Sequence, residues 1–221
     1  MLIDAAIFDF DETMIDLERE HAAASDAFCR ELGADYKQLP ESIRLASGRR
    51  ILDEIREMRT FFGWTESEDE LMARRQRHFD EVARNADLHL LPGVERTVKA
   101  LHAMEITLAI TSSAVGASIE LILRKLGLRE YFTLIVDGSD VQHGKPDPEA
   151  YVITARRLGT SECVVFEDST VGVAAAKAAG MFCIAIRNAR AHFRQDLSKA
   201  DVVLGSFEEL DLSLFASRRA R

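Results

Sequence analysis

From residue 91 onward the chain alternates between short β-prone runs and helical segments, and this alternation restricts its fold more than any other feature. The β-prone runs are 106–110, 134–136, 163–166, 182–186 and 202–204, and the helical segments are 94–104, 115–126, 148–158 and 171–179. Such alternation requires crossover connections between parallel strands, with helices on both faces of the sheet. Together with a buried strand predicted within residues 2–10, it indicates a doubly wound, Rossmann-like α/β core.

Residues 17–88 interrupt this pattern with a highly charged region in which no strand is predicted. Apolar residues recur at helical spacing over 17–32. A second helix is predicted over 40–60, and a third begins at Thr65, which has Glu68 at the spacing of a capping box. We therefore expect an all-helical insert after the first strand. The predicted division is a core of residues 1–16 and 89–221 and a helical domain of residues 17–88.

Polar side chains follow four of the predicted strands, directly or after a short loop. They are Asp9 and Asp11, Thr111 and Ser112, Lys145, and Glu167 and Asp168. In an open α/β sheet the carboxyl ends of the strands form the ligand-binding edge, so these groups can converge. Carboxylates there must be solvated, paired or metal-bound, and oxygen-only ligation suits Mg²⁺ acting on a phosphate. A nucleophile, an acid, a hydroxyl, a cation and metal ligands are what phosphoryl transfer through an aspartyl-phosphate needs.

The composition excludes several other classes of function. A net charge of −9 without a basic stripe argues against a nucleic-acid partner. No apolar run reaches the roughly 18 residues of a membrane span, and the N-terminal residues do not have the pattern of a signal peptide. The three cysteines, at positions 29, 163 and 183, lack metal-like spacing and are typical of a protein in the reducing cytoplasm.

Four motifs, in order and each near a strand end, resemble those of the haloacid dehalogenase-like phosphohydrolases. The similarity is greatest to the branch that contains sugar-phosphate phosphatases and β-phosphoglucomutase. The motifs occupy residues 9–13, 111–113, 144–148 and 166–180. The match covers nearly the whole chain, and the helical insert lies where this branch has its mobile cap domain.

The resemblance implies a role for each residue of the core motifs. Asp9 is expected to attack phosphorus, and Asp11 to protonate the leaving oxygen and then activate water. Thr111 is expected to hydrogen-bond the phosphate, and Lys145 to bind both the phosphate and Asp9.

The resemblance also implies further substrate-binding and metal-binding groups. Ser112 and Ser113 are expected to contact the substrate. Mg²⁺ is the expected cofactor, with the metal-binding residues Asp9, Asp11 (through its carbonyl), Asp168 and Glu167. Of these, Asp168 is expected to contact the metal directly, and Glu167 either directly or from behind a direct ligand.

Two positions depart from the usual pattern of the family. Glu12 replaces the most frequent glycine, so it is expected to stiffen the turn or to face outward. The lysine and asparagine that help β-phosphoglucomutase hold a second phosphate are replaced by Ala114 and Val115. This favours hydrolysis over phosphate relocation.

In the cap, His21 occupies the position of a histidine that the mutase uses near its acid/base aspartate, although it also shares a face with apolar residues. Five arginines could bind an anionic substrate, although a solvated helix face explains most of them equally well: Arg49, Arg50, Arg74, Arg75 and Arg77. Arg49 is the preferred candidate, because it follows Gly48 in a loop that opens a helix.

The first hypothesis is a Mg²⁺-dependent phosphatase that acts as a monomer on a small phosphorylated metabolite, such as a sugar phosphate. A phosphosugar mutase is the alternative within enzymes, and a non-catalytic binding protein with the same fold is the alternative outside them. A dehalogenase is disfavoured, because halide displacement does not require the acid/base group Asp11 or the metal-binding pair Glu167 and Asp168. A nucleotide-binding dehydrogenase is excluded, because no Gly-x-Gly-x-x-Gly follows the first strand.

Overall fold

The computed structural model describes residues 3–44, 48–188 and 195–215, and its centre is a six-stranded parallel sheet. In spatial order the strands are β3 (Leu134–Val136), β2 (Thr107–Thr111), β1 (Ala5–Phe8), β4 (Cys163–Glu167), β5 (Phe182–Ile186) and β6 (Val202–Leu204). Strand β1 pairs with both β2 and β4, so Phe8 lies opposite Ile110 on one side and Phe166 on the other. The predicted doubly wound parallel sheet is confirmed.

Helices cover both faces of the sheet, because its central strands are apolar on both sides. The helices α5 (Val94–Ala103) and α6 (Gly116–Lys125) cover the face formed by Ala6 and Phe8 of β1. The helices α7 (Glu149–Leu158) and α8 (Thr170–Ala178) cover the opposite face, which includes Ala5 and Ile7. The short 3₁₀ turns are Tyr36–Gln38, Arg129–Tyr131, Phe207–Glu209 and Leu212–Phe215.

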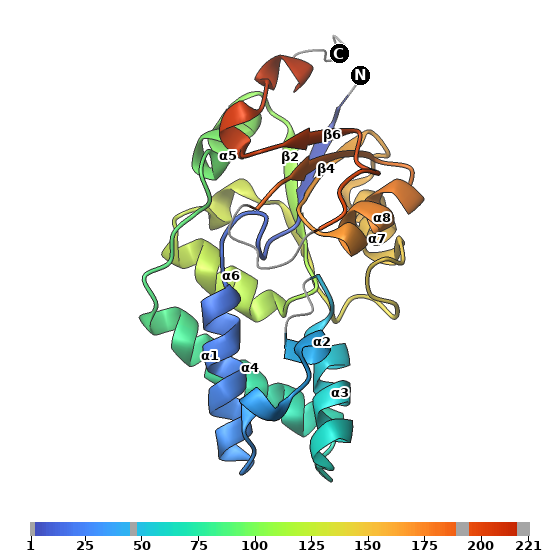
Figure 1. The fold of residues 1–221 in the computed structure, drawn as a ribbon. Coiled ribbons are helices and arrows are strands. Elements are labelled where there is room, and N and C mark those ends of the chain that lie inside the picture. The colour runs from blue at the N-terminus through green and yellow to red at the C-terminus, as the bar shows by residue number, and fades with distance from the viewer. Residues whose placement is uncertain (1–2, 45–47, 189–194, 216–221) are drawn as a thin grey trace.

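Four helices form the insert: α1 (Glu18–Glu31), α2 (Glu41–Arg44), α3 (Ile51–Phe62) and α4 (Glu68–Asn85). They share a small apolar core that includes Phe28, Ile55 and Leu71, and Trp64 packs against it. In Figure 1 these helices lie beyond the carboxyl ends of the strands, as a cap does. The apolar base of the cap, with Phe79 of α4, joins the main core.

Two details of the cap differ from the sequence-based expectations. The helix expected over 40–60 is divided into α2 and α3; residues 45–47 lie outside the described part, and Gly48, with φ 77°, is not helical. A capping box does open α4, but it is formed by Ser67 and Glu70 rather than by Thr65 and Glu68. Periodicity identified the helix, and the hydrogen bonds of its first turn placed its start two residues later.

The order of the strands places the end of β1 beside the end of β4. From this pair the sheet extends through β2 and β3 in one direction and through β5 and β6 in the other. Ligands of doubly wound sheets bind at such a switch point, outside the carboxyl ends of the strands. The first and fourth motifs therefore meet at this edge, which faces the cap (Figure 1).

The cysteines Cys29, Cys163 and Cys183 are buried and unpaired. Burial raises the pKa of each thiol: to about 12 for Cys29 and Cys183 and about 11 for Cys163. Each is therefore a protonated, unreactive core residue at neutral pH. Among the described residues, no helix is both long and apolar enough to cross a membrane.

Candidate active site

Three buried carboxylates converge at the adjacent ends of β1 and β4. Asp9, Glu167 and Asp168 each offer an oxygen within 4.8 Å of the others. The backbone holds them there, because Asp9 N donates to Phe166 O over 2.9 Å and continues the ladder one residue past β1. Three uncompensated charges at this separation would repel strongly in a buried site, so the arrangement requires a cation.

Lys145 supplies one such cation from the loop before α7. Its Nζ donates to Asp9 Oδ1 over 2.5 Å and to Glu167 Oε1 over 2.6 Å, and its side chain is 2% exposed. Burial alone would lower the pKa of Lys145, but these two carboxylates hold it above its ordinary value. The first, third and fourth motifs thus meet in one buried ion-pair network.

Glu167 is the most fully bonded member of the carboxylate cluster. Its Oε1 accepts from Lys145 and from the hydroxyl of Tyr151, and its Oε2 accepts from Asp168 N, Ser169 N and Ser169 Oγ. In this arrangement Glu167 orients Lys145 and the start of α8. Whether it also contacts the metal directly or acts behind a direct ligand stays a prediction. Gly172 is required beside it, because a Cβ there would overlap the Glu167 carboxylate.

Asp9 and Asp168 remain electrostatically unsatisfied without a second cation. Burial raises the pKa of Asp9 to about 8, a rise that Lys145 opposes and Glu167 increases. Burial and the charge of Glu167 raise the pKa of Asp168 well above its ordinary value, although Thr13 Oγ1 donates to Asp168 Oδ1 over 2.8 Å. Buried oxygen donors whose charged forms are disfavoured fit a small divalent cation such as Mg²⁺.

Asp11 faces the cap across the entrance to the cluster. Its Oδ1 is buried without a hydrogen-bond partner among the described residues, and His21 Nε2 of α1 lies 3.6 Å from it. Arg75 Nη2 lies 3.2 Å from His21 Nδ1, and Phe79 stacks on the His21 ring. Because a guanidinium can only donate, Nδ1 of a neutral His21 must accept, which places the imidazole proton on Nε2, toward Asp11.

The structure separates the hydroxyl groups of the second motif. Thr111 is fully buried, with its Oγ1 2.6 Å from Thr154 Oγ1 of α7. Since Thr154 donates its own proton to Ala150 O, Thr111 must be the donor to Thr154. In this arrangement the proton of Thr111 is directed at Thr154, and the role of Thr111 at the phosphate stays a prediction.

Ser112 and Ser113 have different surroundings. Ser112 Oγ accepts from Ala114 N over 3.1 Å, and no acceptor for the Ser112 proton lies among the described residues. Ser113 Oγ donates to Gly48 O of the cap over 2.9 Å. Ser112 is thus the hydroxyl of this motif whose proton is available at the strand end.

Of the two alternatives expected for Glu12, the structure favours a stiffened turn over an outward-facing side chain. Its φ of 61° is in the left-handed region that favours glycine, and its carboxylate accepts from Leu17 N over 3.0 Å and from Asn188 Nδ2 over 2.6 Å. Burial and the nearby Asp16 raise the pKa of Glu12 to about 8. Glu12 therefore connects the segment that enters the cap to the loop after β5.

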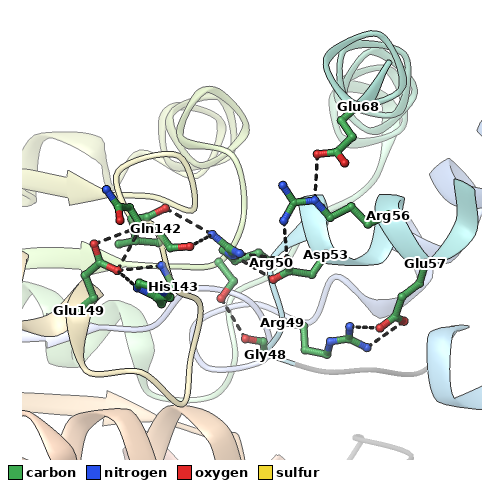
Figure 2. Close-up of polar contacts among 12 residues, drawn as sticks. Gly48, Arg49, Arg50, Asp53, Arg56, Glu57, Glu68, Gln142, His143 and Glu149 are labelled. Carbon is green, nitrogen blue, oxygen red and sulfur yellow. Dashed lines mark hydrogen bonds and ion pairs between the residues drawn. The ribbon is translucent and has the colours of Figure 1, made fainter. Parts of the chain in front are cut away.

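The cap arginines have several different environments. Arg49 forms a bidentate ion pair with Glu57 inside the cap, and the structure does not bring it to the carboxylate cluster. Arg74 and Arg77 pair with Glu31 on the surface, as a solvated helix face predicts. Arg50 instead extends from the cap to Gln142 of the core (Figure 2). Arg75 is buried, with 2% of its surface exposed.

Sequence reasoning missed Tyr151, Thr13 and the importance of Arg75. Tyr151 donates to the acidic cluster from α7, which carries no motif signal of its own, and Thr13 lies within the first motif but had been given no role. A signal for Arg75 was present, because α4 buries Leu71, Arg75, Phe79 and Ala83 at intervals of four residues. A cation on an otherwise apolar stripe indicates a buried charge with a specific partner.

Comparison with known proteins agrees with this geometry. A sequence profile of haloacid dehalogenase-like hydrolases matches residues 3–180. The chain is 31% identical to the fructose-1-phosphate phosphatase YqaB of Escherichia coli, over 82% of this chain and 95% of that protein. It is 29% identical to a β-phosphoglucomutase of Bacillus subtilis, over 95% of this chain and 92% of that protein. The crystal structure of CbbY from Rhodobacter sphaeroides in complex with phosphate superposes with a TM-score of 0.82, at 26% identity and over 95% and 96% of the two chains.

The chain therefore belongs to the haloacid dehalogenase-like hydrolase family. Within that family it is a phosphoric monoester hydrolase, of the branch that includes β-phosphoglucomutase and sugar phosphatases.

Proposed function

We propose that this protein is a Mg²⁺-dependent phosphatase of small phosphorylated sugars that reacts through an aspartyl-phosphate on Asp9. The observation that carries the proposal is the buried cluster in which Asp9 contacts Lys145 and lies beside Asp168. At its entrance lies an Asp11 oxygen that accepts no hydrogen bond from the described residues. The sugar class is supported by the printed function of the E. coli relative, a fructose-1-phosphate phosphatase.

In the first half-reaction an Asp9 oxygen attacks phosphorus while the bond from phosphorus to the sugar oxygen breaks. Asp11, in its protonated form, donates its proton to the departing sugar oxygen. In the second half-reaction Asp11 accepts a proton from water as that water attacks phosphorus, which releases phosphate and regenerates the Asp9 carboxylate. His21, with its proton directed at Asp11 by Arg75, orients the Asp11 carboxyl.

The remaining groups bind and neutralise the phosphoryl group. Ser112 donates a hydrogen bond to a phosphoryl oxygen, and Lys145 offsets negative charge there. Asp9, Asp168 and the carbonyl of Asp11 would hold Mg²⁺, and Glu167 keeps Lys145 in place. When bound, Mg²⁺ neutralises phosphate charge and orients the group for in-line attack.

A mutase of the β-phosphoglucomutase kind is the second candidate, because a relative has that activity. Ala114 and Val115 count against it, since neither side chain can bind a second phosphate. Incubation with β-glucose 1-phosphate and a bisphosphate activator distinguishes the two. Glucose 6-phosphate formed faster than free phosphate would establish the mutase.

The proposed activity can be tested with a panel of phosphorylated sugars, nucleotides and small acids. Phosphate release is measured for the wild type with Mg²⁺ and with EDTA. We expect release from one or more sugar phosphates with Mg²⁺ and none with EDTA. Release from non-sugar substrates alone would contradict the sugar class, and release that persists in EDTA would contradict the metal requirement.

We further infer that the enzyme works as a single protomer in a reducing compartment such as the cytoplasm. Every side chain of the proposed mechanism comes from one chain, and the buried thiols are unpaired.

Binding of Mg²⁺ is expected to strengthen as pH rises and to release protons. The raised pKa values of Asp9 (about 8) and Asp168 mean that the metal-free site retains protons at neutral pH, and ligation must displace them. Affinity should then rise by up to about tenfold per pH unit for each proton released, until the pH passes the folded pKa. Calorimetry in buffers of different ionisation enthalpy measures both the Mg²⁺ affinity and the number of protons released.

The control for this prediction is Asp9→Asn, which removes one of the titrating ligands and should weaken the pH dependence. An Mg²⁺ affinity that is independent of pH in the wild type would contradict the raised pKa values.

Separate substitutions of the neighbouring residues Ser112 and Thr111 should have unequal effects on catalysis. Ser112→Ala removes the available donor and is expected to lower kcat/KM by about 10²-fold, as loss of a donor to a developing charge does. Thr111→Val removes only the bond to Thr154, so its main expected effect is a loss of about 1 kcal/mol of stability. Steady-state kinetics and thermal melts of both variants check this order, and the reverse order would identify Thr111 as the phosphate ligand.

A further inference from the structure

Arg50 at the start of α3 forms hydrogen bonds from the cap to the core (Figure 2). Its Nη1 donates to Gln142 O over 2.8 Å and to Val141 O over 3.3 Å. Its Nε and Nη2 donate to Asp53 over 2.9 and 3.0 Å. The side chain is 11% exposed, and the bonds to Asp53 and Val141 are partly buried, whereas the bond to Gln142 lies at the surface.

These contacts use four of the five N–H donors of the guanidinium. Asp53 fixes the plane of the group, and the two core carbonyls occupy the donors on its other side. In this arrangement Arg50 is therefore not free to bind the anionic part of a substrate, and its polar contacts connect two segments about 90 residues apart in sequence. The adjacent Arg49, by contrast, pairs with Glu57 within the cap (Figure 2).

The core segment that Arg50 contacts leads directly into the third motif. Its carbonyls face Arg50, while its amides at Gln142 and His143 donate to the Glu149 carboxylate at the start of α7 over 3.1 and 2.8 Å. Both sides of these peptide groups are therefore fixed, one by the cap and the other by the core.

Arg50 also packs against the residue before Lys145. A Cβ at Gly144 would lie 3.0 Å from Arg50 Nε and 3.1 Å from its Cγ, so the absence of a side chain there allows close contact. The next residue, Lys145, contacts Asp9 and Glu167 at 2.5 and 2.6 Å. A small shift of this segment would therefore move the ammonium group relative to the nucleophile.

We propose that Arg50 is a positioning residue that couples docking of the cap to the placement of Lys145. The bonds from Arg50 to the 141–142 carbonyls form when the cap is docked and order the segment that carries Lys145. The effect on catalysis rests on the proposed phosphatase function, whereas the ordering of the segment does not.

A second contact supports docking at the same edge of the cap. Gly48, with φ 77°, accepts at its carbonyl from Ser113 Oγ over 2.9 Å. A Cβ on Gly48 would lie 2.8 Å from Ser169 Oγ and 2.9 Å from Val171 Cγ2. The loop before α3 therefore approaches the second and fourth motifs as Arg50 approaches the third.

The test compares Arg50→Met and Arg50→Lys with the wild type, and Arg56→Met is the matched control. Arg56 lies on the same helix and also pairs with Asp53, but its other ion pair is with Glu68 of the cap (Figure 2). Hydrogen exchange of the amides of residues 141–147 is measured on full-length protein with Mg²⁺. The same samples give melting temperatures, kcat and KM.

For Arg50→Met we expect faster exchange confined to the 141–147 segment and a kcat lowered by about tenfold to hundredfold, as displacement of a catalytic group does. KM should change less than kcat. Arg50→Lys, which retains a cation and donors, should recover part of both effects. Arg56→Met should match the wild type in both measurements.

Unchanged exchange in Arg50→Met would overturn the proposal, and so would faster exchange without loss of kcat in an active enzyme. An equal effect of Arg56→Met would also overturn it, because the change would then reflect the general stability of the cap. If the wild type hydrolyses no substrate, the proposed function fails, and the exchange measurement alone decides whether Arg50 orders the segment.

Discussion

Asp9→Asn is expected to abolish phosphate release and, at the same time, to raise the melting temperature of the metal-free protein. The amide has nearly the same shape but cannot act as the nucleophile, so activity should fall by roughly four orders of magnitude or more. The stability gain arises because burial raises the pKa of Asp9 to about 8, so the charged form is disfavoured in the folded state.

The raised pKa of Asp9 determines how the stability of the metal-free protein changes with pH. Between the ordinary carboxyl pKa near 4 and the folded value of about 8, the folded state retains a proton that the unfolded state has lost. The metal-free wild type should therefore lose stability as pH rises through this window. Asp9→Asn lacks this loss, so the amount by which it is more stable than the wild type should grow with pH. Each kcal/mol of added stability should raise Tm by about 2–4 °C.

The matched control is Asp87→Asn, because the Asp87 side chain is 92% exposed and its recorded ion pair is with the exposed His89. It should leave both activity and Tm unchanged. Phosphate release and thermal melts across a pH series, without metal and with Mg²⁺, measure all of these effects. If Asp9→Asn retains activity within tenfold of the wild type, Asp9 is not the nucleophile.

Lys145→Met is expected to abolish activity as well, but with the opposite effect on stability. Lys145 contacts both Asp9 and Glu167 in a buried site, so methionine leaves the charge of Glu167 unpaired and removes the donor to Asp9. Removal of one partner from a buried ion pair typically costs about 3–5 kcal/mol. Mg²⁺ should recover part of this loss, because it neutralises the same carboxylates.

Lys99→Met is the control for this variant, since Lys99 is half exposed and pairs with Glu95 on the surface of α5. Denaturant unfolding with and without Mg²⁺ gives the stability change, and steady-state phosphate release gives the activity. A Lys145→Met protein as stable as the wild type would show that the acidic cluster does not depend on this cation. Opposite stability effects at Asp9 and Lys145 are the expected result.

The sequence was sufficient to predict the sheet and the convergence of the motif residues at its edge. Strands buried on both faces are continuously apolar, and their ends are marked by the first charged residue, as at Asp9 and Glu167. Parallel strands then bring those ends together whatever the details of the loops. The meeting of Asp9 and Asp168 therefore follows from the topology, whereas Lys145 reaches them from the loop before α7.

The details that the sequence did not reveal are hydrogen-bond partners that are distant in sequence. Thr111 and Ser112 are consecutive hydroxyl residues, and the partner that distinguishes them, Thr154, is 43 residues away on α7. Arg49 and Arg50 are likewise consecutive, but only the structure shows that Arg50 extends to Gln142. Which of two consecutive residues makes such a contact depends on helix rotation and packing, and periodicity does not determine these.

The central claim, that Asp9 forms the covalent phosphoryl adduct, can be tested most directly without a known substrate. Beryllofluoride binds an aspartate carboxylate as an analogue of its phosphoryl group, and fluorine NMR detects the bound species. With Mg²⁺, the account predicts bound resonances for the wild type and for Asp87→Asn, and none for Asp9→Asn. Bound resonances that persist in Asp9→Asn, or their absence from a wild type that releases phosphate, would contradict it.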